Sequence, residues 1–262
     1  GIFDAHDRGI LRSASLMANA PATANAICRA RTRPTLGIGV HLTLVDGTPM
    51  LLPDRVPTLL GDDGRFHASW KPFIVACLRG RISMQEVERE LTAQIESAAS
   101  YGIALTHLDA HKHVHLFPPV FEIVVRLATR FGIPVVRVPY ERTMADLPLA
   151  VWAHMDYRFA AAHSVLTPQF VGRAMTGVMT ADSLAAALRR LRAGHTELMV
   201  HPGYLDDALR QLPTRLLGSR VAEVELLTSP AIRHLVADEH VRLDCHDERI
   251  GLSSQRSYRH AS

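Results

Sequence analysis

Short apolar segments alternate with helical patterns along most of this chain, and this alternation limits the possible folds more than any other feature. The clearest strands are predicted at 36–44 (LGIGVHLTL), 105–110 (LTHLDA) and 134–138 (PVVRV). Helical patterns separate them. Strands that alternate with helices pair in parallel, so we expect an α/β fold, either a (β/α) barrel or a doubly wound sheet.

Start and stop signals delimit two of the helices. Ser83-Met84-Gln85-Glu86 is a capping box that opens a helix ending near Gly102, and residues 118–131 form a second helix that Gly132 closes. Weaker patterns predict further helices at 1–8, 19–29, 183–191, 219–227 and from 230, and further strands at 11–18, 196–200 and 241–245. Residues 48–68, rich in Pro and Gly, predict a long loop. Residues 142–180 predict only mixed loop and helix, with a weak strand around 163–166.

The barrel is favoured because no Gly-rich phosphate loop follows a strand, as a dinucleotide-binding sheet would require. In a barrel, functional groups gather at the carboxyl ends of the strands. Such ends carry His41, the polar cluster at 109–115, Arg137 and His201. We predict one domain over residues 1–250, with 251–262 as a flexible tail.

Four histidines and one aspartate fall within the nine residues 107–115. In an extended strand His107, Asp109 and His111 share one face, and His113 and His115 would join it if the chain stayed extended. A single such histidine is usually structural, but buried imidazoles each need a partner. Imidazole and carboxylate are the usual ligands of zinc and related ions. The cluster therefore predicts a metal or catalytic site.

Composition excludes several classes of protein. The net charge of +3 comes from 27 Arg and 2 Lys scattered among the acidic residues, so no basic stripe indicates nucleic-acid binding. The three cysteines are far apart and lack a CxxC pair, which indicates free thiols in a reducing compartment. No apolar run is long enough for a spanning helix. We expect a cytoplasmic protein, and the sequence leaves a homodimer open.

Several motifs, in order, resemble the YdjC-like carbohydrate deacetylases, a family that includes chitooligosaccharide deacetylases. They are GILRSASLMAN, LGIGVHLTLVDGTP, THLDAHKHVH with FPPVFEIVVRLATRFGIPVVRVPYE, TELMVHPGY and VAEVELLTSP. The segments GHTELMVHPGYLDD and TGVMT are similar to the branch associated with hopanoid biosynthesis. The resemblance implies a distorted (β/α) barrel that removes acetyl groups from N-acetylated sugars or glycolipids with a divalent ion, Mg²⁺ or Zn²⁺.

The resemblance also implies roles for individual residues. His41 and His111 match the family's metal-binding histidines, and His201 in the HPG motif matches a pocket histidine assigned as the general acid. Asp109 is a candidate base, ligand or orienting residue. The remaining candidates contact substrate or support the ligands: His113, His115, Arg137 and Glu141.

One family motif is not in this sequence. Family members carry Asp-Asp-Phe-Gly on a first strand, ahead of a helix resembling residues 1–9, and that strand would supply an Asp ligand or base. We therefore expect weak activity, or none, from this chain alone. Two alternatives stay open: a catalytically inactive barrel that binds a sugar or partner, and another barrel metallohydrolase.

Overall fold

The computed structural model describes residues 1–141, 147–212 and 214–246. By its internal contacts the chain divides into two compact units. The large unit contains Ala14–Thr167 with His246, and the small unit contains Gly1–Ser13 and Pro168–Cys245. The single domain predicted over 1–250 stays a prediction, and the tail predicted over 251–262 lies outside the described residues.

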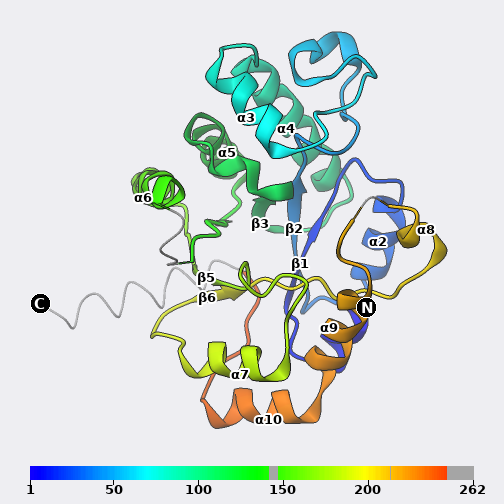
Figure 1. The fold of residues 1–262 in the computed structure, drawn as a ribbon, viewed down its shortest axis with the longest axis vertical. Helices are drawn as coiled ribbons and strands as arrows, with labels where there is room; N and C mark the ends of the chain where they lie inside the picture. The colour runs from blue at the N-terminus through cyan, green and yellow to red at the C-terminus, as the bar shows by residue number, and fades with distance from the viewer. Residues whose placement is uncertain (142–146, 213, 247–262) are drawn as a thin grey trace, which may run out of the picture. The chain divides into compact units, whose positions relative to one another are not determined.

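A four-stranded sheet is the centre of the large unit, with its strands in the order β1-β2-β3-β4 (Figure 1). They are β1 (Ser13–Leu16), β2 (Gly37–Leu42), β3 (Leu105–Ala110) and β4 (Val135–Val136). β2 pairs with β3, and β3 with β4, in parallel. Leu166 extends the sheet by a single parallel bridge to Val135 in place of the weak strand expected there. The prediction of an α/β fold with parallel strands is confirmed.

Helices of the large unit connect these strands. They are α2 (Thr23–Ala30), α3 (Trp70–Leu78), α4 (Met84–Ser100), α5 (Pro118–Phe131) and α6 (Leu147–Ala162), with short 3-10 helices η1 (Pro53–Arg55), η2 (Pro57–Leu59) and η3 (His111–Leu116). α4 and α5 lie side by side (Figure 1) and bury their apolar faces with β2 and β3. This arrangement fixes the carboxyl ends of β2 and β3 next to each other.

The predicted helix boundaries hold where capping residues define them. The Ser83 side chain accepts a hydrogen bond from the Glu86 N–H at the start of α4. α5 ends at Gly132, which has φ 65°, a left-handed conformation that glycine adopts without a steric penalty. α3 was not predicted, because the Pro- and Gly-rich segment before it gives no clear signal for where a helix begins.

The small unit combines helices with a two-stranded parallel sheet of β5 (Gln169–Val171) and β6 (Thr196–Leu198). Its helices are α1 (Ile2–Asp7), α7 (Ala181–Arg189), α8 (Asp207–Arg210), α9 (Gly218–Thr228) and α10 (Pro230–Asp238). α9 contacts both α1 and α10. The strand predicted at 241–245 is wrong, since these residues pair with no strand in the described structure.

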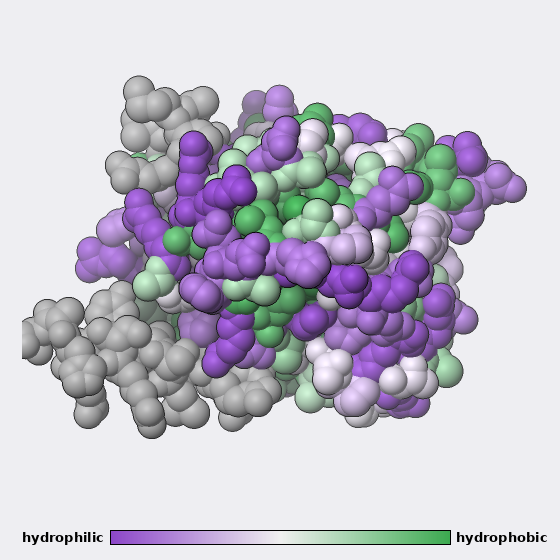
Figure 2. All heavy atoms as spheres, turned by 90° about the horizontal axis from the view of Figure 1, so that it is seen from below, coloured by the Kyte–Doolittle hydropathy of each residue, from purple (hydrophilic) through white to green (hydrophobic). Residues whose placement is uncertain are grey.

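Among the described residues, no helix has both the length and the hydropathy needed to cross a bilayer. Figure 2 shows hydrophilic side chains over much of the face it presents, with smaller apolar areas between them. The apolar side chains of the large unit are concentrated between its sheet and helices.

Candidate active site

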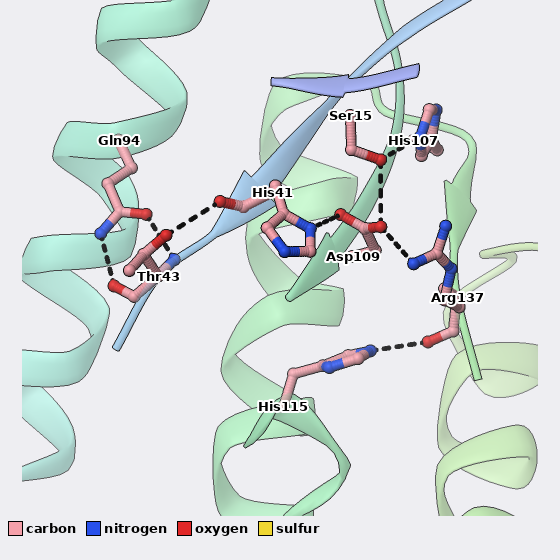
Figure 3. Close-up of polar contacts among 8 residues, drawn as sticks. All are labelled: Ser15, His41, Thr43, Gln94, His107, Asp109, His115 and Arg137. Carbon is pink, nitrogen blue, oxygen red and sulfur yellow. Dashed lines mark hydrogen bonds and ion pairs between the residues drawn. The ribbon is translucent and has the colours of Figure 1, made fainter. Parts of the chain in front are cut away.

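The site is organised around Asp109, which lies near the end of β3 with 1% of its surface exposed. Its Oδ1 accepts a hydrogen bond from His41 Nδ1 at 2.8 Å. Its Oδ2 accepts one from Ser15 Oγ at 3.0 Å and forms an ion pair with Arg137. Figure 3 shows this carboxylate between the three side chains, which come from three other segments of the unit.

Parallel pairing explains how residues far apart in the sequence meet here. His41 and Asp109 are register partners in β2 and β3. Arg137 follows β4, and its N–H donates to the Leu108 carbonyl at 3.0 Å, which continues the pairing by one residue. His41, Asp109 and Arg137 therefore lie at the ends of neighbouring strands, whereas the roles predicted for them stay predictions.

The electrostatics of Asp109 favour its charged form. Burial alone would raise its pKa, but the charges of Arg137 and His41 outweigh that effect and hold the pKa well below its usual range. An ionised Asp109 only accepts hydrogen bonds, so the proton of the 2.8 Å contact belongs to His41 Nδ1. Neutral His41 then has its lone pair at Nε2.

His107 shares the Asp109 face of β3, as the strand pattern predicted. Its Nε2 lies 3.0 Å from Ser15 Oγ and its Nδ1 lies 2.9 Å from Thr106 Oγ1. Its ring also lies 4.6 Å from the ring of His246. Gly39 of β2 makes room for it, because a Cβ there would come within 2.5 Å of the ring. His107 is a buried supporting residue next to the cluster.

The chain does not stay extended after β3, so the condition under which His113 and His115 would share its polar face is not met. Lys112 and His113 adopt left-handed φ values of 52° and 55° inside η3. These conformations redirect the backbone and separate the histidines. His111 stays near His41, with ring centroids 5.5 Å apart, whereas His115 turns toward Arg137.

His115 is a structural partner of Arg137. Its Nε2 lies 2.8 Å from the Arg137 backbone carbonyl, and burial lowers its pKa to about 4, so the neutral ring donates to that carbonyl. In the described part of the chain its Nδ1 has no hydrogen-bond partner. Burial and the charge of Arg137 also hold the pKa of His113 well below its usual range. Both rings are therefore neutral.

His111 lies beside Asp46, which follows β2. Its Nε2 is 3.5 Å from Asp46 Oδ2, and Lys112 Nζ is 2.6 Å from the same oxygen. Burial, followed by the nearby His41, lowers the pKa of His111. Neutral imidazole is the form that binds metal ions.

Two of the side chains at this site, His41 and His111, suit a divalent ion, but a third ligand is not in place in the described residues. His41 and His111 are close together and half-buried, the pKa of His111 is lowered, and a carboxylate orients His41, as is usual for metal-ligating histidines. Asp109 is already occupied by three partners, so it suits an orienting role better than that of a direct ligand. The described residues contain no group of three or more His, Cys, Asp or Glu arranged to hold an ion.

Two further predicted residues, Glu141 and His201, follow other strands than β2 and β3. Glu141 is half-buried and follows β4, four residues after Arg137. His201 belongs to the small unit, where it follows β6. Its backbone N–H donates to Glu223, and its carbonyl accepts from Arg220 at 3.5 Å. Burial, opposed by that N–H, raises the pKa of Glu223.

Comparison with known proteins decides the family. The family model described as YdjC-like protein matches residues 1–238. The chain belongs to the YdjC-like family. The carbohydrate deacetylase of Geobacillus stearothermophilus is 34% identical over 244 residues, covering 93% of this chain and 88% of that protein. The carbohydrate deacetylase of Brevibacillus brevis is 32% identical over 250 residues, covering 93% and 90%.

A solved structure supports the fold. It is the crystal structure of a candidate cellobiose-phosphate cleavage protein from Enterococcus faecalis V583, with a TM-score of 0.79 and 25% identity. The match covers 94% of this chain and 90% of that one. The similarity of fold therefore extends over nearly the whole chain.

Ser15, Asp46 and Lys112 are the residues that sequence reasoning missed. Ser15 lies in a strand that was predicted, but its contact with Asp109 depends on how β1 is placed in the sheet. Asp46 and Lys112 lie in turns whose backbone conformations only the structure reveals. The one available signal was that Lys112, next to His111, is one of only two lysines in the chain.

Proposed function

We propose that this YdjC-like protein is a metal-dependent hydrolase that removes the acetyl group from an N-acetylated sugar. The observation that carries the proposal is the pairing of His41 with His111 at the ends of parallel strands, with Asp109 orienting His41. The relatives named carbohydrate deacetylase support the reaction and the substrate class.

His41 and His111 would hold the ion, Mg²⁺ or Zn²⁺. A divalent ion there would supply Lewis-acid polarisation of the amide carbonyl and of the attacking water. Asp109 keeps the His41 Nδ1–H directed away from the ligand side, and Arg137 keeps Asp109 ionised. We propose that His113, His115 and Glu141 support this arrangement or contact the sugar.

We propose His201 as the general acid that protonates the departing amine. It lies three positions after the last residue of β6 and precedes Pro202-Gly203. Loss of a general acid costs about 10²- to 10⁴-fold in rate. His201→Ala should therefore keep its metal and lower kcat by that order, with a smaller change in KM. Loss of the metal would instead make His201 a ligand.

The metal assignment is tested by elemental analysis and by acetate release from N-acetylglucosamine oligosaccharides. We expect one ion per chain, lost in His41→Ala and in His111→Ala and retained in the matched control His154→Ala, a substitution of an exposed histidine on α6. Unchanged stoichiometry in both site variants would remove the assignment. Acetate release should be measured on this chain and on a version extended before Gly1 by the family's Asp-Asp-Phe-Gly segment.

A second candidate function is sugar binding without turnover. It is favoured by the finding that the described residues offer fewer than three suitably placed metal ligands. Sugar binding by a metal-free chain that releases no acetate in either version would support it.

Finer assignments are also proposals. The distorted (β/α) barrel would be tested by an experimental structure. The link to the hopanoid branch and to a glycolipid substrate is based on GHTELMVHPGYLDD and TGVMT alone, and a comparison of acetate release from glycolipid and free sugar would test it.

A further inference from the structure

Asp46 is held in place by contacts on several sides. Its N–H donates to the His67 carbonyl at 2.8 Å, and its own φ of 57° is left-handed. This conformation is uncommon for a residue other than glycine. It brings the carboxylate to 3.5 Å from His111 Nε2.

Lys112 anchors that carboxylate. Its Nζ lies 2.6 Å from Asp46 Oδ2 and 3.2 Å from the Ala68 carbonyl. The side chain therefore connects η3 with the residues after β2 and the residues before α3. Because Lys112 immediately follows His111, the same contact restrains the backbone that carries the His111 ring.

Hydrogen-bond chemistry then determines which nitrogen of His111 carries the proton. A carboxylate only accepts hydrogen bonds, so a bond to Asp46 places the proton on His111 Nε2 and leaves the lone pair on Nδ1. His41 has the opposite arrangement, since its Nδ1–H donates to Asp109 and its lone pair is on Nε2.

We propose that Asp46, anchored by Lys112, is a positioning residue that holds His111 in the Nε2–H tautomer and presents its Nδ1 to the ion. The two imidazoles then offer different nitrogens, each selected by its own carboxylate. The tautomer of His111 is a property of the metal-free chain, whereas the binding of an ion at its Nδ1 rests on the proposed function.

The tautomers can be read by NMR on the metal-free chain with ¹⁵N-labelled histidine at pH 8. Spectra of His41→Ala and His111→Ala assign the signals. We expect a pyridine-type Nδ1 for His111 and a pyridine-type Nε2 for His41. Asp46→Ala should convert His111 to a tautomer mixture and leave His41 unchanged. A pyridine-type Nε2 for wild-type His111, or no change in Asp46→Ala, overturns the proposal.

Zn²⁺ affinity supplies the second readout. Loss of a partner that orients a ligand typically costs 10- to 100-fold in metal affinity. Asp46→Ala should therefore lower the affinity for Zn²⁺ by about that factor. Lys112→Ala should weaken Zn²⁺ less, and Lys112→Arg should restore most of the affinity. The matched control is Lys71→Ala, a substitution of the other lysine in the chain.

The outcomes separate this inference from the proposed function. If Asp46→Asn abolishes Zn²⁺ binding while the His111 tautomer is unchanged, Asp46 is a ligand and the positioning role is wrong. If the tautomers are as expected but His41→Ala and His111→Ala bind Zn²⁺ normally, the positioning role stands and the proposed metal site fails.

Discussion

Asp109 and Glu90 are both carboxylates of the large unit with almost no exposed surface, but different groups surround them. Asp109 contacts a guanidinium, an imidazole and a hydroxyl. Glu90, on α4, accepts from the Met50 and Leu51 backbone N–H groups at 2.7 and 3.0 Å and from the Gln94 amide at 2.8 Å. One carboxylate orients side chains that can do chemistry, whereas the other fixes a loop.

Other side chains of α4 near Glu90 also bind the segment that follows β2. Gln94 exchanges two 2.8 Å hydrogen bonds with the backbone of Thr43, so its amide continues the pairing of β2 (Figure 3). Glu86 accepts from the backbone N–H and the hydroxyl of Thr58. The loop at residues 48–68 is therefore held in place by buried side chains of α4. Burial of a carboxylate does not by itself mark an active site; the nature of its partners does.

The largest expected effect comes from Asp109→Ala. Asp109→Ala removes one partner of the buried ion pair with Arg137, which costs about 3–5 kcal/mol of unfolding free energy. Urea denaturation measures it, and metal affinity should fall as well because His41 loses its orienting group. A loss below about 1 kcal/mol would show that Arg137 finds another partner and that the cluster is looser than its geometry indicates.

Glu90→Ala should lower the unfolding free energy by less than Asp109→Ala does, and it should leave metal binding unchanged. It leaves two backbone N–H groups and the Gln94 amide without their acceptor, for about 2–3 kcal/mol of unfolding free energy. Metal content should not change, since Glu90 contacts neither His41 nor His111. A variant that loses its ion would contradict the separation between the loop anchor and the site.

Gly39→Ala tests the packing beneath the Asp109 cluster. A Cβ at this position meets the His107 ring at 2.5 Å, so the ring must shift, at a cost of about 1–2 kcal/mol. The shift should also disturb Ser15, which contacts both His107 and Asp109. Thermal unfolding measures the cost, with Gly218→Ala as the control because nothing lies within 4 Å of a Cβ there.

Asp156 on α6 is a third buried carboxylate, and its Oδ2 has no hydrogen-bond partner among the described residues. Burial and the nearby Glu122 raise its pKa to about 8. Its folded pKa is above the unfolded one. The contribution of Asp156 to the unfolding free energy is therefore fully present below pH 4 and falls by about 1.4 kcal/mol per pH unit until pH 8. Asp156→Asn should remove this slope in urea titrations between pH 5 and 8, and a retained slope would assign it to other groups.

Helices and strands could be predicted from the sequence where Gly or Pro residues mark their ends. β3 and α5 were predicted with the observed boundaries, because Gly102, Pro118 and Gly132 delimit them. Sequence reasoning also located His41, Asp109 and Arg137 at neighbouring strand ends, because parallel pairing aligns such ends. The turn after His111 could not be predicted, since Lys112 and His113 are left-handed without being glycine.

Other misses have the same origin in tertiary structure. The strand predicted at 241–245 has a suitable composition but no partner strand in the described residues. Asp46 gains its position from contacts with His67 and Lys112, which lie 21 and 66 residues away in sequence. Local patterns contain no information about such contacts.

The register of β2 against β3 has a consequence for folding kinetics. The bond between His41 and Asp109 joins residues 68 positions apart, and the bond between Ser15 and Asp109 joins residues 94 apart. Contacts of such long range form only after large loops have closed, and they slow folding. The cluster therefore assembles late, after α4 and α5 have formed locally. Appearance of the His41 Nδ1–H signal during refolding would time the closure of the sheet itself.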